Sequence, residues 1–158
     1  MDKTFEERQK RENEEYYRKW LACGFKSEKS EMPVNEYGWF VPVLRLHHPV
    51  ETLTVFDKKG YRASIEFCQL PNNRWVAASD LTCQMHGYGS ACSIWDPQFD
   101  TKEEAITAEL DRIEKALQDK DRKPFVLQAL QAQRNNYKQV EIEMAFQPMT
   151  QFEQVSLF

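Results

Sequence analysis

The chain has 158 residues, and its 21 Lys and Arg against 25 Asp and Glu give a formal net charge of −4. That length fits one domain of ordinary size, and an aromatic content of 13% is too high for a disordered chain. The mild acidity argues against a nonspecific nucleic-acid binder, and no apolar run approaches the ~20 residues of a membrane span. The first residues also lack an apolar signal segment, so we expect a cytoplasmic protein.

The first predicted element is a helix over residues 4–22. Charged residues of both signs recur at helical neighbour spacing, whereas apolar residues gather only late, from Tyr16 to Leu21. Gly24 fits the position that stops a helix. We therefore expect the last turns to dock on the body. The mixed-charge face favours a solvated surface over a partner-binding one.

An antiparallel meander of four or five strands is predicted next. The turn at 57–60 contains Gly60, which suits a left-handed position, and residues 61–67 alternate cleanly between apolar and polar. A second turn follows at 71–73. The predicted strands are 39–46, 52–55, 61–67, 74–78 and 88–95, with an irregular loop at 79–87.

Two helices and a final strand complete the pattern. Thr101 and Glu104 form a capping box, and apolar residues at helical spacing follow it as far as Leu117. Pro124 suits the first position of a further helix that runs to about residue 138. Residues 140–146 then alternate as a short strand.

The expected fold is α+β, with an N-terminal helix, an antiparallel meander of four or five strands and two C-terminal helices on one face. We divide the chain into an N-terminal helix at 1–25, a single α+β domain at 26–146 and a tail at 147–158. A helix, a meander and a helix is also the outline of double-stranded-RNA-binding domains. Their function does not carry over, because the acidic segment at 100–104 would repel phosphates where those domains are basic.

A metal-binding interpretation depends on Cys83 and His86, whose spacing is typical of one half of a zinc site. With Cys92 and with Cys68 on a preceding strand they make a four-ligand candidate. Structural zinc sites normally show two close ligand pairs, and this sequence has one. The favoured interpretation is that all four cysteines, Cys23 included, are reduced and that no metal or cofactor is bound.

A catalytic interpretation uses the same loop, where Asp80, Cys83 and His86 offer a nucleophile and a base. No third orienting group is evident. The sequence also lacks a phosphate-binding loop, a nucleophile elbow and a His-Glu-x-x-His motif. We therefore expect that the protein is not an enzyme.

A nucleic-acid interpretation depends on the open face of the predicted sheet. Four basic residues could form a modest patch there: Arg45, Lys59, Arg62 and Arg74. Four aromatic residues could stack on bases, although at strand positions such side chains are more often core. These are Trp39, Trp75, Tyr88 and Trp95.

The sharpest signal is the segment Gln154, Val155, Ser156, Leu157 and Phe158. It resembles the peptide by which bacterial replication and repair proteins bind the DNA polymerase sliding clamp. The pattern of that peptide is Gln, an aliphatic residue, Ser or Asp, Leu, then Phe or Leu. Four positions match the preferred type, and Val155 stands where Leu is commoner. The resemblance covers five residues, so it implies a partner and not a family.

The resemblance also implies roles for these residues. Leu157 and Phe158 would fill an apolar cleft on the clamp, Gln154 would hydrogen-bond at a neighbouring pocket, and Ser156 would help hold the turn. Residues 147–153 would act as a polar tether. The alternative is that the two apolar residues fold back onto the protein's own sheet or dock in a dimer.

We therefore expect an adaptor or interaction protein that binds the clamp and acts in replication, repair or mobile-element biology. It would reach DNA indirectly and would not bind a membrane. One alternative is a small nucleic-acid-binding module that uses its sheet face. A second is a small enzyme or zinc protein that uses Cys83 and His86.

Overall fold

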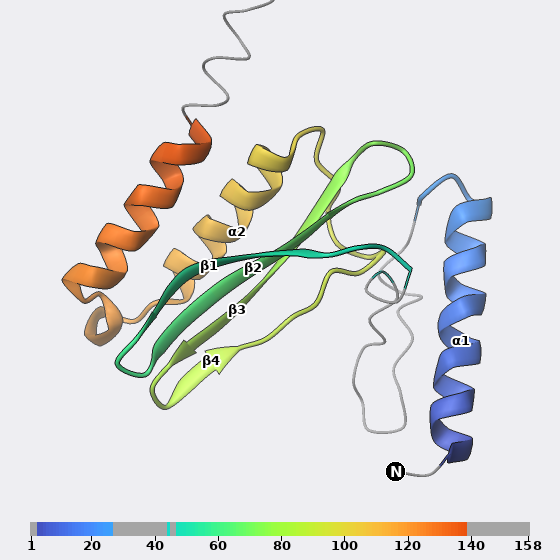
Figure 1. The fold of residues 1–158 in the computed structure, drawn as a ribbon, viewed down its shortest axis with the longest axis horizontal. Helices are drawn as coiled ribbons and strands as arrows, with labels where there is room; N and C mark the ends of the chain where they lie inside the picture. Colours follow the sequence, from blue (N-terminus) through green and yellow to red (C-terminus); the bar gives the residue numbers. More distant parts are fainter. Residues whose placement is uncertain (1–2, 27–43, 45–46, 139–158) are drawn as a thin grey trace, which may run out of the picture.

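The computed structural model describes residues 3–26, 44 and 47–138, and it confirms the predicted α+β fold (Figure 1). The predicted strand at 140–146 and the tail lie outside the described residues, as does the predicted strand at 39–46 apart from the buried Leu44. The elements in chain order are α1 (Lys3–Ala22), β1 (Glu51–Lys58), β2 (Tyr61–Gln69), β3 (Trp75–Cys83), β4 (His86–Tyr88), α2 (Lys102–Ala116), the 3-10 helix η3 (Asp119–Asp121) and a helix at 124–138.

The four strands form one antiparallel sheet in the order β1-β2-β3-β4. The β1–β2 hairpin turns at Lys59 and Gly60, which have φ values of 55° and 82°, as the sequence predicts. A bulge between Thr54 and Phe56 breaks the alternation of β1, so that Val55 and Phe56 are both buried.

The second half of the meander differs from the prediction. β3 continues to Cys83, so residues 79–83 are strand and not an irregular loop, and β4 ends at Tyr88. Asp80 is exposed between buried neighbours, which is the alternation of a half-buried strand. The predicted strand at 88–95 is wrong beyond Tyr88. Its apolar residues are buried by packing without strand pairing, and this burial produced the strand-like pattern.

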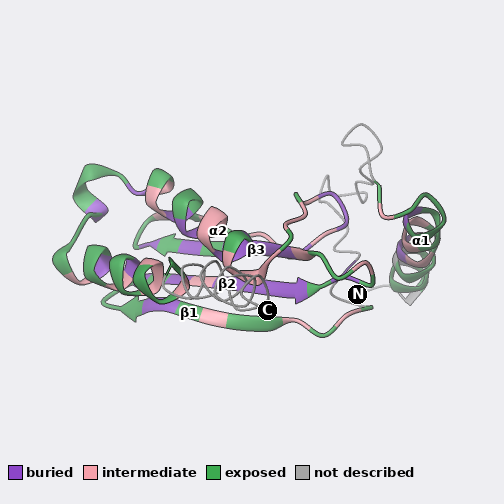
Figure 2. Ribbon diagram, turned by 90° about the horizontal axis from the view of Figure 1, so that it is seen from above, coloured by how far each residue is buried: buried purple, intermediate pink, exposed green. Residues whose placement is uncertain are grey.

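The side chains of the sheet point into two apolar clusters. The first lies between the sheet and the two C-terminal helices, which cover one face (Figure 2). Its helical members include Ile106, Leu110 and Ile113 of α2. The N-cap of α2 is Thr101, whose hydroxyl accepts a hydrogen bond from the Glu104 backbone N–H at 3.2 Å. The Thr101 half of the predicted capping box and the apolar stripe are therefore confirmed.

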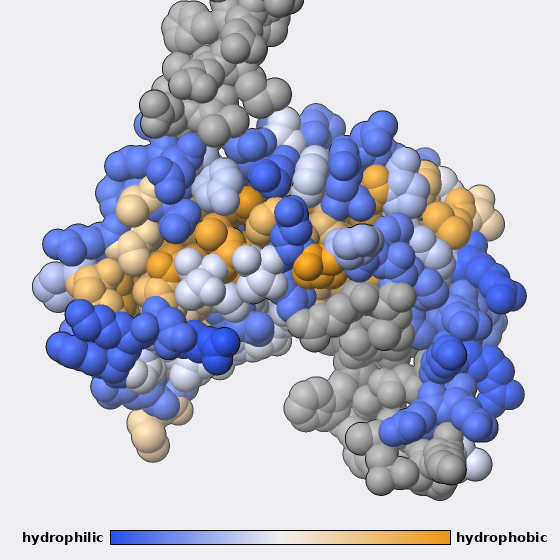
Figure 3. Space-filling view, viewed as in Figure 1, coloured by the Kyte–Doolittle hydropathy of each residue, from blue (hydrophilic) through white to orange (hydrophobic). Residues whose placement is uncertain are grey.

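The second cluster joins α1 to the other face of the sheet. Trp20 is 2% exposed and packs edge-to-face on Phe25, with ring centroids 5.1 Å apart. Tyr16 contacts Trp95 in the same way, at 6.3 Å. Most of the visible surface of α1 is hydrophilic, and apolar atoms show near its C-terminal end, where Leu21 is 38% exposed (Figure 3). Its last turns dock on the body, as expected. None of the described helices is both long and apolar enough to cross a bilayer.

Candidate functional site

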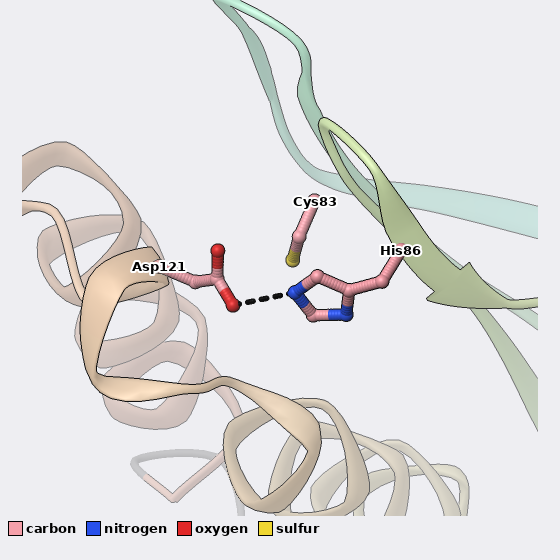
Figure 4. Close-up of side chains that lie close together, drawn as sticks. All are labelled: Cys83, His86 and Asp121. Carbon is pink, nitrogen blue, oxygen red and sulfur yellow. Dashed lines mark hydrogen bonds and ion pairs between the residues drawn. The ribbon is translucent and has the colours of Figure 1, made fainter.

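Three side chains with metal-binding or catalytic chemistry meet at the end of the sheet that carries the β1–β2 and β3–β4 turns (Figure 4). Cys83 is the last residue of β3, and His86, its partner in the strand register, opens β4. Asp121 comes from η3, which follows α2. One potential ligand atom of each residue lies within 4.8 Å of the other two. The site therefore combines two neighbouring strands with a distant turn.

The β3–β4 hairpin places His86 by a turn of only two residues. Gln84 adopts a φ of 51°, and its backbone N–H donates to the Gly60 carbonyl at 2.9 Å, which ties the two hairpin turns together. A Cβ atom on Gly87 would lie 2.0 Å from the Leu81 carbonyl oxygen, so only glycine permits this approach of the two strands.

Asp121 is 2% exposed and is held by two hydrogen bonds to one oxygen. Oδ2 accepts from the Gln118 backbone N–H at 3.1 Å and lies 2.7 Å from His86 Nε2. Burial opposes ionisation of Asp121, but the hydrogen bonds from His86 and Gln118 outweigh it and hold the pKa of this carboxyl below its usual value. Asp121 is therefore ionised at neutral pH, and the Nε2–H of His86 is the donor.

The orientation of the imidazole limits what the site can do. The Cys83 sulfur and the Asp121 carboxylate both face the Nε2 edge of the ring, and the other ring nitrogen points away (Figure 4). In a nucleophile–His–Asp triad, the nucleophile and the carboxylate use different ring nitrogens. Burial, and after it the charge of Asp121, raises the pKa of the Cys83 thiol, which does not activate it as a nucleophile. The arrangement suits three ligands around one point better than a catalytic relay.

The structure separates the four predicted zinc ligands into two pairs. In the β2–β3 register, Cys68 lies opposite Val76 and Tyr61 lies opposite Cys83, so Cys68 and Cys83 are seven residues apart along the ladder. At 3.3 Å per residue that is about 23 Å. Cys68 belongs to the second apolar cluster together with Cys92, whose thiol donates to the Glu66 carbonyl at 3.4 Å.

Asp80 does not join Cys83 and His86 either. Its side chain is on the exposed face of β3 and accepts a hydrogen bond from the Ser90 backbone N–H at 3.0 Å. The carboxylate that the sequence analysis missed is Asp121. The signal that could have indicated it is the charged turn at 119–123, where a buried acidic residue caps the short helix.

The described members of the predicted basic patch do not form one continuous surface, because Arg74 lies at the opposite end of the sheet from Lys59 and Arg62. Arg62 lies near the start of β2, beside the β1–β2 turn and opposite Asp57, and it lines an open groove with Asp80 and Thr82. Arg74 lies beyond the opposite end of β3, where it pairs with Asp100 at 3.5 Å. Lys59 is in the β1–β2 turn, and Arg45 lies outside the described residues.

The described aromatic candidates are engaged with the protein itself. Trp95 is 7% exposed, and Trp75 packs on Phe67 with ring centroids 6.4 Å apart. Tyr88 lies under the Arg112 guanidinium, and its hydroxyl is 2.7 Å from the Ser79 hydroxyl. These three residues are therefore packed against the protein itself, although Trp95 lies outside the strands. Trp39 lies outside the described residues.

Comparisons with known proteins found no match for this chain. No protein-family model matches the chain, and no curated protein or solved structure matches it. The functional argument therefore depends on the chain's own residues.

Proposed function

We propose that the protein is an adaptor that binds the bacterial DNA polymerase sliding clamp through Gln154, Val155, Ser156, Leu157 and Phe158. It would act in replication, repair or mobile-element biology. The observation that carries the proposal is the sequence of these five residues, which lie outside the described part of the chain.

The chemistry of the segment supports this partner. Two large apolar side chains, Leu157 and Phe158, lie beyond the tether at 147–153 and would act as anchors that an apolar cleft can bury. A short segment loses conformational entropy when it becomes ordered on the clamp, so we expect a Kd in the micromolar range, about −8 kcal/mol.

The folded body supports recruitment through a protein partner. The net charge is −4, and Arg74, which pairs with Asp100, lies at the opposite end of the sheet from Lys59 and Arg62. A protein that reaches DNA through the clamp does not need a basic surface of its own. The body would then present its own surface to a further component at the replication or repair site.

The test is direct binding of the purified full-length chain to purified clamp, measured by surface plasmon resonance. We expect the Leu157→Ala/Phe158→Ala variant to lose at least about 30-fold in affinity, since each anchor is worth about 2 kcal/mol or more. The matched control is Thr150→Ala/Gln151→Ala, which changes two residues of the same segment outside the pentapeptide and should bind like the wild type.

Competition by an established clamp-binding peptide provides a second readout, because it identifies the cleft that is used. Absence of binding by the intact chain, or equal binding by the anchor variant, would contradict the proposal. Far-UV circular dichroism of each variant checks that the body remains folded.

A further inference from the structure

We propose that Cys83, His86 and Asp121 form a Zn²⁺ site with three protein ligands and one open position. A thiolate, an imidazole nitrogen and a carboxylate oxygen are the three ligand types that zinc takes from proteins. The site is independent of the clamp-binding segment, and it replaces the predicted set with Cys68 and Cys92, which the fold places elsewhere.

The distances are close to those of a tetrahedral site. Zn–N and Zn–O bonds of about 2.0–2.1 Å and a Zn–S bond of about 2.3 Å place ligand atoms roughly 3.3–3.6 Å apart. The three atoms already lie within 4.8 Å of one another. The sulfur therefore has to approach either partner by at most about 1.2 Å, and the 2.7 Å contact between His86 and Asp121 opens by about half an ångström. Both movements are within the reach of side-chain torsions.

Zinc binding would release one proton from the site. The Nε2–H of His86 points at the Asp121 carboxylate, and zinc would take the place of this hydrogen. A neutral ring then carries its proton on Nδ1, which faces away from the site. The Cys83 thiol releases one proton to solvent as the Zn–S bond forms.

The surroundings hold the ligands in place and leave one approach open. The Gln118 backbone N–H fixes the Asp121 carboxylate, which is the outer hydrogen bond that metal ligands usually have. Cys83 is 1% exposed, whereas the His86 side chain is 29% exposed. Solvent therefore reaches the metal position from the His86 side, where a water molecule would complete the tetrahedron.

The competing explanation is that the His86–Asp121 hydrogen bond only fastens η3 to β4. This explanation accounts for the pair, and it treats Cys83 only as a packed member of the first apolar cluster. It also predicts that Zn²⁺ leaves the thermal stability of the protein unchanged. A zinc site instead raises the Tm of the wild-type chain, because the metal binds the folded state and not the unfolded one.

The experiment uses the purified full-length chain after removal of metal with a chelator. Zn²⁺ is titrated in competition with a chromogenic zinc indicator, and Co²⁺ is used as a spectroscopic probe. We expect one metal ion per chain, the intense visible bands of tetrahedral Co²⁺ and a thiolate-to-cobalt charge-transfer band. Cys83→Ser should abolish the charge-transfer band. Asp121→Asn and His86→Gln should weaken Zn²⁺ binding by at least about 100-fold.

Two variants serve as matched controls. Cys23→Ser removes an exposed thiol, and Asp119→Asn removes an exposed carboxylate at the other end of η3. Both should bind like the wild type, as should Leu157→Ala/Phe158→Ala, which separates this proposal from clamp binding. Asp121→Asn keeps an oxygen for the Gln118 N–H, so it remains testable even if another variant unfolds.

The proposal is overturned if the wild-type chain fails to bind one equivalent of Zn²⁺ or shows no rise in Tm with the metal. It is also overturned if Asp121→Asn keeps the wild-type affinity, or if folded Cys83→Ser keeps the charge-transfer band.

Discussion

Glu109 of α2 is a carboxyl group that the packing of helix on sheet places in a partly closed polar network. Its Oε2 accepts a hydrogen bond from the Ser79 hydroxyl at 2.6 Å, and the Arg112 guanidinium lies 3.7 Å away. Burial raises the pKa of Glu109, and this effect outweighs the hydrogen bond from Ser79 and the charge of Arg112, which lower it. The folded state therefore holds the proton of this group more tightly than the unfolded chain does.

The sign of the resulting pH dependence follows from this shift. A carboxyl with a raised pKa in the folded state favours folding while it is protonated, and that contribution is lost as the pH rises through the folded pKa. Glu109→Gln keeps an oxygen for Ser79 and cannot ionise. We therefore expect the variant to gain stability relative to the wild type as the pH increases from about 4 to about 8. Urea unfolding at several pH values measures this difference.

The matched control for Glu109 is Glu51→Gln, which removes an exposed carboxyl at the start of β1. Its stability difference from the wild type should change much less over the same pH range. A constant difference between Glu109→Gln and the wild type across that range would show that burial does not control this carboxyl.

At the scale of the elements, Trp20 is the largest of the buried side chains that attach α1 to the body. Trp20 is 2% exposed and contacts Tyr17 and Phe25, whereas the next residue, Leu21, is 38% exposed. Trp20→Ala should lower the free energy of unfolding by about 3–5 kcal/mol, since it leaves a large cavity. Leu21→Ala, the matched control, should change it by about 0.5 kcal/mol or less. Urea unfolding followed by circular dichroism gives both values.

Limited proteolysis gives a second readout for α1. If Trp20 anchors the helix, a low concentration of trypsin should cleave α1 faster in Trp20→Ala than in Leu21→Ala, because its Lys and Arg residues become accessible when the helix detaches. Equal cleavage rates and equal unfolding free energies would contradict the anchoring role.

The elements also show which features a sequence reveals. Local signals predicted α1, the Gly60 turn and the Thr101 cap, because each depends on residues a few positions apart. The β3–β4 turn was missed because its positive φ belongs to Gln84, which is not a usual turn residue. Asp121 was missed as a site residue because only the fold brings η3, 35 positions along the chain, to His86.

At the scale of the whole molecule, the two apolar clusters are built on the same two strands. Along β2, Phe67 belongs to the first cluster and its neighbour Cys68 to the second; along β3, Ala77 and Val76 divide in the same way. Neighbouring residues of a strand point to opposite faces of the sheet. Because both clusters use side chains of β2 and β3, unfolding of these strands disrupts both clusters together. We therefore expect the described body to unfold in one step.

The cooperativity can be tested with a mild change in one cluster and a probe in the other. Ile106→Val in α2 should cost about 1 kcal/mol. In a Trp39→Phe/Trp75→Phe background, fluorescence reports on Trp20 and Trp95, which belong to the second cluster. We expect the urea midpoints from fluorescence and far-UV circular dichroism to coincide in the parent and to shift together in the variant. A fluorescence midpoint that stays in place while the dichroism midpoint falls would mean that α1 and its cluster unfold independently of the helix–sheet body.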